Sequence, residues 1–149
     1  MRFTQAQVRI LLGLGEETFR HWRSALPPLA PHQGHAPTFT LGDILALAVV
    51  SEIVKLAGGK VSKLRPRAKD LFEVCAEVVD ADDRRAVLMI NPHHITRLSS
   101  ANVTNPLIST MFLVPAGRLL GSLRAKIQGS PELDTQLTLP LERQSHEQR

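Results

Sequence analysis

The sequence predicts a mainly α-helical protein with a small β component, arranged as two modules and a tail. Apolar residues recur at helical spacing through residues 1–79, which predicts several packed helices. Short β-prone runs separated by Asn-Pro pairs follow within residues 80–129, and beyond Gly129 the sequence turns polar and loses its period. A hydrophobic content of 43% in 149 residues is enough for a core. We therefore expect a helical domain over residues 1–79, a small α+β module over residues 80–129 and a disordered tail over residues 130–149.

The first 25 residues have the pattern of two short helices joined by a tight turn. Thr4 is placed to cap the first helix, with Gln7 three residues later in the capping-box position. Gly13-Leu14-Gly15 ends that helix, and a second helix from Glu16 buries Phe19 and Trp22, which are three residues apart. This arrangement is typical of a helix-turn-helix, in which the exposed side of the second helix enters a DNA major groove.

Two longer helices are expected next. Thr40 and Asp43 cap a helix from Leu41 to about Leu56 that is apolar nearly all round, as in a core helix. Gly58-Gly59 ends it, and a fourth helix is predicted from Ser62 to about Val79, with Pro66 near its first turn. Its apolar residues alternate spacings of four and three, as in a helix-packing seam: Leu64, Ala68, Leu71, Cys75 and Val78. This seam packs either on the third helix or on another chain.

The α+β module follows a charged linker over residues 80–85. Three runs, 86–90, 95–99 and 107–114, predict an antiparallel sheet, and a helix from Ala116 to about Ile127 follows Pro115. An apolar stripe lies along this helix: Leu119, Leu120, Leu123 and Ile127. Because so small a sheet is marginal alone, a second copy of the chain or the N-terminal half must complete it. We expect a homodimer through this stripe, or a protein partner that binds the module.

The N-terminal half resembles the MerR-like winged helix-turn-helix family. The segments that carry the resemblance are Thr18-Phe19-Arg20-His21-Trp22 in the second helix, Leu26-Pro27-Pro28 at its exit, and Thr40 with Asp43 after a segment that we expect to form a short hairpin, the wing of this family. The sequence departs from the family pattern in three places: at Gly15, where a Ser or Thr cap is usual, at His21, which replaces an aromatic hydroxyl, and in the wing, which has no Tyr. The resemblance covers about half of the chain. It implies a transcriptional regulator that binds double-stranded DNA.

The candidate DNA-binding residues fall into three groups. The second helix offers Glu17, Thr18, Arg20, His21 and Arg23, the wing tip offers His32, Gln33 and His35, and the start of the fourth helix offers Lys60, Lys63 and Arg65. Arg20 is the leading candidate, because a guanidinium can donate two hydrogen bonds to guanine or phosphate.

The charge of the chain is unevenly distributed. Residues 1–69 hold ten Lys and Arg against four Asp and Glu, a net +6, whereas residues 70–149 hold eight against ten, a net −2. A basic half attracts DNA phosphates, and such binding weakens steeply with salt. Two other functions remain open: an architectural DNA-binding factor, such as an excisionase-like or partition protein, and a protein-interaction adaptor without DNA binding.

Several other functions find little support in the sequence. No nucleophile with a matched base and no Gly-rich phosphate loop is present, so we expect neither an enzyme nor a cofactor. His32 with His35, and the pair His93-His94, supply too few ligands for a structural zinc site, and we expect the second pair to form a plain turn. A single cysteine, no membrane-spanning apolar run and an N-terminus that leads directly into a helix favour the cytoplasm.

Overall fold

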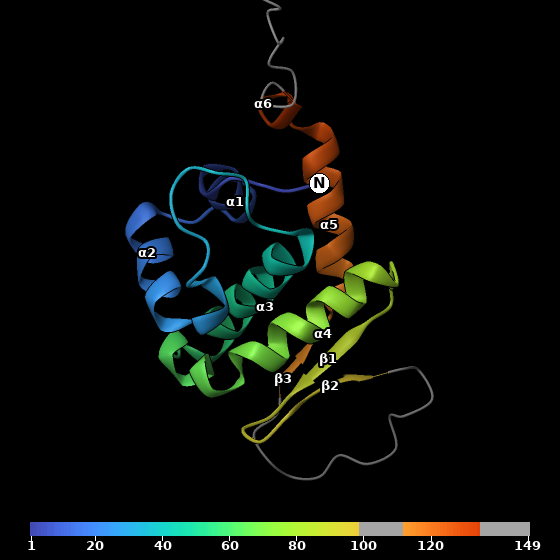
Figure 1. Ribbon diagram of the computed structural model, residues 1–149. Helices are drawn as coiled ribbons and strands as arrows, with labels where there is room; N and C mark the ends of the chain where they lie inside the picture. The colour runs from blue at the N-terminus through green and yellow to red at the C-terminus, as the bar shows by residue number, and fades with distance from the viewer. Residues whose placement is uncertain (99–111, 135–149) are drawn as a thin grey trace, which may run out of the picture.

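The structure, a computed structural model, describes residues 1–98 and 112–134. It is mainly helical with one small sheet, as the sequence predicts (Figure 1). The elements in chain order are α1 (Gln5–Leu12), α2 (Glu16–Ala25), η1 (Pro27–Leu29), α3 (Leu41–Ala57), η2 (Val61–Arg67), α4 (Ala68–Asp80), β1 (Val87–Ile90), β2 (Ile95–Leu98), β3 (Phe112–Val114), α5 (Ala116–Gly129) and α6 (Pro131–Asp134), where η1 and η2 are 3-10 helices.

The two short helices predicted for the N-terminus are present and are joined by a tight turn. A capping box opens α1: the Thr4 hydroxyl accepts from the Gln7 amide at 3.3 Å, and the Gln7 side chain accepts from the Thr4 amide at 2.8 Å. Gly13 ends α1 with φ of 63°, a left-handed conformation that favours glycine. Gly15 precedes α2 and caps it without a side chain.

α3 is the central helix of the fold, and Thr40 with Asp43 forms its capping box. α4 packs along it, and at Gly42 the two helices lie so close that an added Cβ would stand 3.0 Å from the Ala76 Cα. The predicted seam of α4 is buried, apart from the half-buried Leu64. Of the two alternatives left by the sequence, α4 therefore packs on α3 of its own chain.

The predicted start of the fourth helix was wrong. Residues 61–67 form the 3-10 helix η2, and α4 begins at Ala68 instead of near Ser62. Pro66 contributes to the difference, because it lacks the amide proton that would donate to the Ser62 carbonyl in an α-helix. The Lys and Arg residues of this segment therefore lie on short, tight turns.

The predicted hairpin wing was also wrong. Between η1 and α3 the chain forms a loop, and Phe39 pairs instead with Phe3, through backbone N to O distances of 2.9 and 3.1 Å. Pro31 and Pro37 explain the loop, because neither can donate a backbone hydrogen bond to a strand partner. The entrance to α3 is thereby tied to the residue that precedes α1.

The three strands form an antiparallel sheet in the order β2-β1-β3. β1 is the central strand and buries Leu88 and Ile90, while α4 contacts β2 and α3 contacts β3. The sheet lies beside α4 in Figure 1. Ser99 and residues 107–111 of the predicted strands fall outside the described residues.

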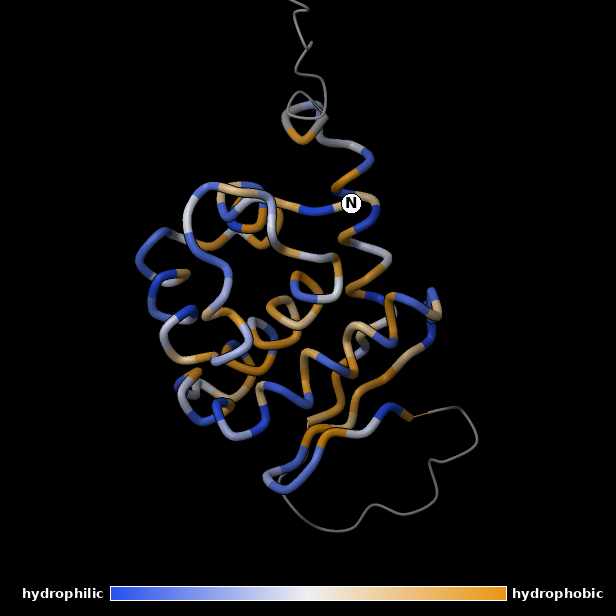
Figure 2. Tube along the Cα trace, viewed as in Figure 1, coloured by the Kyte–Doolittle hydropathy of each residue, from blue (hydrophilic) through white to orange (hydrophobic). Residues whose placement is uncertain are grey.

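One hydrophobic core extends across the boundary expected near residue 80. The stripe of α5 packs inward against α1, α3 and α4: Leu120 and Leu123 are buried, and Leu119 and Ile127 are partly buried against the same core. In Figure 2 the hydrophobic stretches gather where α3, α4, α5 and the sheet meet. The stripe is covered within one chain, so it does not supply the exposed apolar surface on which the homodimer expectation depended.

The predicted start of the disordered tail was wrong as well. α6 occupies Pro131–Asp134, and its Leu133 is buried and joins the core. An apolar side chain with a place in the core orders the backbone that carries it. The rest of the predicted tail, residues 135–149, lies outside the described residues.

Candidate nucleic-acid interface

The outer side of α2 is polar and the inner side is apolar. Phe19, Trp22 and Ala25 are buried, and the Phe19 ring meets the Phe39 ring edge-on, with centroids 5.8 Å apart and an angle of 66° between planes. The residues between them face outward because a helix turns about 100° per residue. The exposed residues of this helix are Glu16, Glu17, Thr18, Arg20, His21 and Ser24.

Arg20 lies on the exposed side, as predicted. Its guanidinium is 3.9 Å from the Glu16 carboxylate, and the two side chains are 65% and 63% exposed. An ion pair in so much solvent contributes about 0–1 kcal/mol, so it does not hold the guanidinium in place. Arg20 is therefore free to reorient towards a ligand.

Arg23 is placed differently from its neighbours on α2. It is only partly exposed, and its Nη1 donates to the Gln5 side-chain oxygen at 3.2 Å. This contact joins α2 to the start of α1. Arg23 thus positions α2 in the described structure, rather than projecting from its outer side.

His32 does not lie at an exposed loop tip, as the sequence analysis expected. Its ring stacks on Phe39, with centroids 4.3 Å apart, and its Nδ1 lies 2.9 Å from the Thr38 hydroxyl oxygen. Its Nε2 is 3.7 Å from Asp43, the capping residue of α3, and the side chain is 13% exposed. The aromatic neighbour explains the correction, because stacking removes apolar ring surface from water.

The other two wing-tip candidates remain on the surface. Gln33 and His35 are exposed, on either side of Gly34, whose φ is 79°. The Gln33 amide nitrogen donates to the Ala30 carbonyl at 3.2 Å, which tightens the loop. These residues lie on an exposed loop, not on a hairpin.

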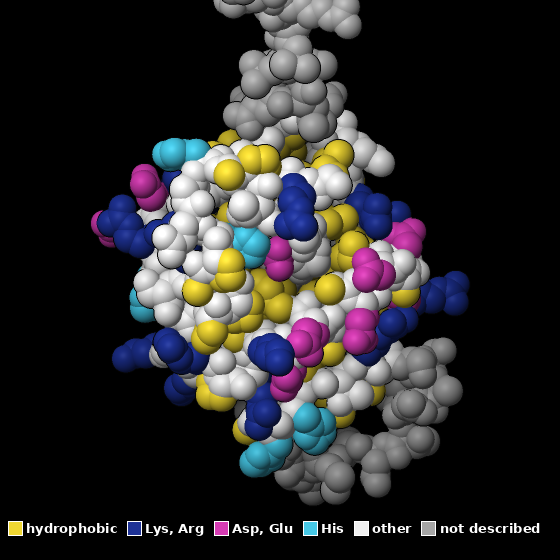
Figure 3. Space-filling model, in the orientation of Figure 1, with side chains coloured by type: hydrophobic (Ala, Val, Ile, Leu, Met, Phe, Trp, Pro, Cys, Tyr) yellow, Lys and Arg dark blue, Asp and Glu magenta, His cyan; other side chains and the backbone are white. Residues whose placement is uncertain are grey.

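The basic residues of η2 and the residue before it lie next to the C-terminal end of α2. Arg65 Nη1 donates to the Ser24 carbonyl oxygen at 3.5 Å, and η2 contacts α2. Within residues 1–98 and 112–134, no carboxylate lies within 4.0 Å of the charged groups of Lys60, Lys63 or Arg65. All three side chains are exposed. In Figure 3 the dark-blue side chains gather along the edge formed by α2 and η2.

Ser24 is a candidate interface residue that the sequence analysis did not name. It is exposed on α2, its hydroxyl donates to the Arg20 carbonyl at 3.2 Å, and its own carbonyl accepts from Arg65. Ser24 lies four residues after Arg20, so helical spacing alone could have placed both on one face.

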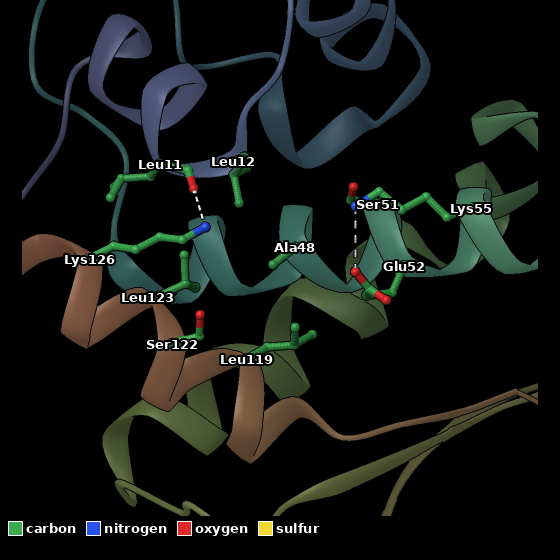
Figure 4. Close-up of a pocket in the computed structure, with 10 residues that line it drawn as sticks. All are labelled: Leu11, Leu12, Ala48, Ser51, Glu52, Lys55, Leu119, Ser122, Leu123 and Lys126. Atoms are coloured by element: carbon green, nitrogen blue, oxygen red, sulfur yellow. Dashed lines mark hydrogen bonds and ion pairs between the residues drawn. The ribbon is translucent and has the colours of Figure 1, made fainter.

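A small hollow between α1, α3 and α5 is a weaker candidate for a site (Figure 4). Its volume is about 100 Å³, whereas small-molecule sites span roughly 300–1,000 Å³. Lys126 Nζ donates to the Leu11 carbonyl at 3.2 Å across it, which satisfies a free carbonyl at the end of α1. The hollow therefore belongs to helix packing and not to a ligand site.

The described part of the chain offers neither an accessible thiol nor a metal-binding cluster. Burial raises the pKa of the Cys75 thiol to about 12, so it is not an active nucleophile at neutral pH. No cluster of three or more His, Cys, Asp or Glu able to hold a metal occurs in residues 1–98 and 112–134. Among the helices of those residues, none has both the length and the apolar character needed to cross a bilayer.

The geometry and charge of α2 and η2 are thus the only support for the candidate nucleic-acid interface. Comparison of the chain with protein-family models, with curated proteins and with solved structures finds no match.

Proposed function

We propose that the protein is a transcriptional regulator that binds double-stranded DNA in the cytoplasm through α2. The observation that carries the proposal is that α2 and η2, which the Arg65–Ser24 hydrogen bond joins, both expose basic side chains: Arg20 and His21 on α2, and Lys60, Lys63 and Arg65 at η2. The MerR-like pattern of α1 and α2 supports the same proposal.

In this proposal, α2 enters the major groove and η2 contacts the backbone beside it. Arg20 donates to a guanine or a phosphate, and His21 and Ser24 present smaller hydrogen-bonding groups on the same side of the helix. Thr18 is exposed at the start of the helix and offers a further hydroxyl there. Lys60, Lys63 and Arg65 neutralise phosphates without reading sequence. A homodimer would bring two copies of α2 to half-sites about one helical turn apart.

Fluorescence anisotropy with a pool of labelled genomic fragments, followed by sequencing of the bound fraction, tests the proposal. We expect affinity to fall by orders of magnitude between about 50 and 200 mM salt, because several phosphates are contacted. Arg20→Ala should weaken binding to an enriched fragment by about 1–3 kcal/mol. Arg118→Ala is the matched control, because Arg118 is an exposed arginine on α5.

Three outcomes separate the candidate functions. Undetectable or salt-independent binding of the wild-type chain would contradict DNA binding and favour the protein-interaction adaptor. Enrichment of tandem sites with strong bending, measured by gel mobility of circularly permuted fragments, would favour the architectural factor. Equal effects of Arg20→Ala and Arg118→Ala would show that α2 is not the recognition helix.

A further inference from the structure

The turn between β1 and β2 is an ordered projection with histidines at its tip. The Asn91 side-chain oxygen accepts from the backbone amides of His93 and His94, each at 2.8 Å. The backbone amide of Asn91 donates to the His94 carbonyl at 3.1 Å. These bonds fix the backbone of the turn. Both histidines are exposed. Among the described residues, only Asn91 is within hydrogen-bond distance of either ring, with its Nδ2 at 3.2 Å from His94 Nε2.

η2 connects this turn to the recognition helix. On one side Arg65 donates to the Ser24 carbonyl of α2 at 3.5 Å, and on the other side Arg67 Nε donates to the Pro92 carbonyl of the turn at 3.3 Å. The three elements therefore follow one another along a single edge of the molecule, from α2 through η2 to the turn (Figure 1).

The charges along this edge favour an anionic ligand. Lys60, Lys63 and Arg65 are exposed cations between α2 and the turn, and histidine side chains lie over the turn in Figure 3. Acids lie at both ends of this edge: Glu16 and Glu17 are exposed on α2, and Asp70 and Glu73 belong to α4. Glu16 is 3.9 Å from Arg20, Asp70 is 3.7 Å from Arg67 and Glu73 is 3.8 Å from Lys69, so these three acids each have a basic neighbour.

We propose that the β1–β2 turn is a second phosphate-contacting element, and that His93 and His94 donate to the backbone of the duplex that α2 and η2 hold. This inference rests on the proposed function. A duplex carries one phosphate charge per roughly 1.7 Å of its axis, so a ligand seated on α2 and η2 continues past them with further phosphates. Imidazole N–H groups and the exposed turn suit such contacts, which fix register without reading bases. The turn would then take the role of the wing, which the loop of residues 30–40 does not form.

The test compares two substitutions with the same change of charge in the full chain. His93→Glu places a carboxylate at the tip, and Gln128→Glu places one at an exposed position on α5. With a fragment that binds wild-type protein, His93→Glu should weaken binding roughly tenfold, as expected for removal of a charged hydrogen bond. The slope of log affinity against log salt should become shallower by about 0.9 for each phosphate-neutralising cation whose charge the new carboxylate cancels. His93→Arg should keep or steepen the slope.

Each outcome bears on one of the two proposals. If His93→Glu and Gln128→Glu give the same affinity and slope while Arg20→Ala weakens binding, the turn does not touch the duplex and the recognition helix stands. If the wild-type chain binds no DNA, both proposals fail. The fluorescence of Trp22, the single tryptophan, checks that each variant remains folded.

Discussion

Leu123→Ala tests whether the two halves of the chain share one core. Leu123 is 3% exposed on α5 and lines the hollow between α1 and α3. Truncation of a buried leucine to alanine costs about 2–5 kcal/mol, depending on how far the cavity is refilled. Because Leu123 borders a hollow of about 100 Å³ that already opens to solvent, water can enter the enlarged space, and we expect the lower part of that range, about 2–3 kcal/mol.

Trp22 reports on the unfolding of the other half of the sequence, because it is the single tryptophan and lies in α2. If the core is continuous, Trp22 fluorescence and the helical circular dichroism signal should lose their native values at the same temperature. For a chain of this size each kcal/mol lowers Tm by roughly 2–4 °C, so the shift should be about 5–10 °C with both probes. Ser122→Ala, at an exposed position on the same helix, should shift Tm little.

An unchanged Trp22 transition in Leu123→Ala, with a lowered transition for the rest of the chain, would refute the shared core. It would restore two independent modules, with a boundary near residue 80. Leu123→Asp extends the test: a buried leucine replaced by a charge should unfold the whole chain. A folded monomer produced from a wild-type dimer by Leu123→Asp would instead show that the stripe of α5 is a subunit interface.

Three further predictions concern packing and buried groups. Gly117→Ala should destabilise the chain by about 1–3 kcal/mol in urea unfolding, because an added Cβ would lie 2.3 Å from the Arg84 carbonyl carbon. The Asp83 pKa is lowered from 3.8 by the Arg85 amide and by Arg97. A lowered folded-state pKa stabilises the fold above about pH 4 and loses that contribution as pH falls further, so Asp83→Asn should be less stable at pH 7 and show a smaller acid-induced decline. Cys75, whose pKa is about 12, should react with thiol reagents at pH 8 only as fast as the chain opens; rapid reaction in the folded state would contradict its burial.

Patterns that act over three or four residues were predicted correctly from the sequence. Thr4 with Gln7 and Thr40 with Asp43 form the two expected capping boxes, and Gly13 ends α1 as expected. Capping and helical periodicity depend on neighbours that the backbone itself brings together, so the residues alone determine them. The exposure of Arg20 and His21 followed from the same periodicity.

Contacts between distant segments were decided only by the tertiary structure. His32 was expected at an exposed tip, but its ring stacks on Phe39. Phe39 was expected to follow a hairpin wing, but its backbone pairs with Phe3. The apolar stripe of α5 was expected to meet another chain, yet it meets α1 and α3, and Lys126 reaches the carbonyl of Leu11 across 115 positions. A sequence pattern shows that an apolar face must be covered. Which surface covers it depends on how the helices and the sheet pack together, and that is a property of the whole fold.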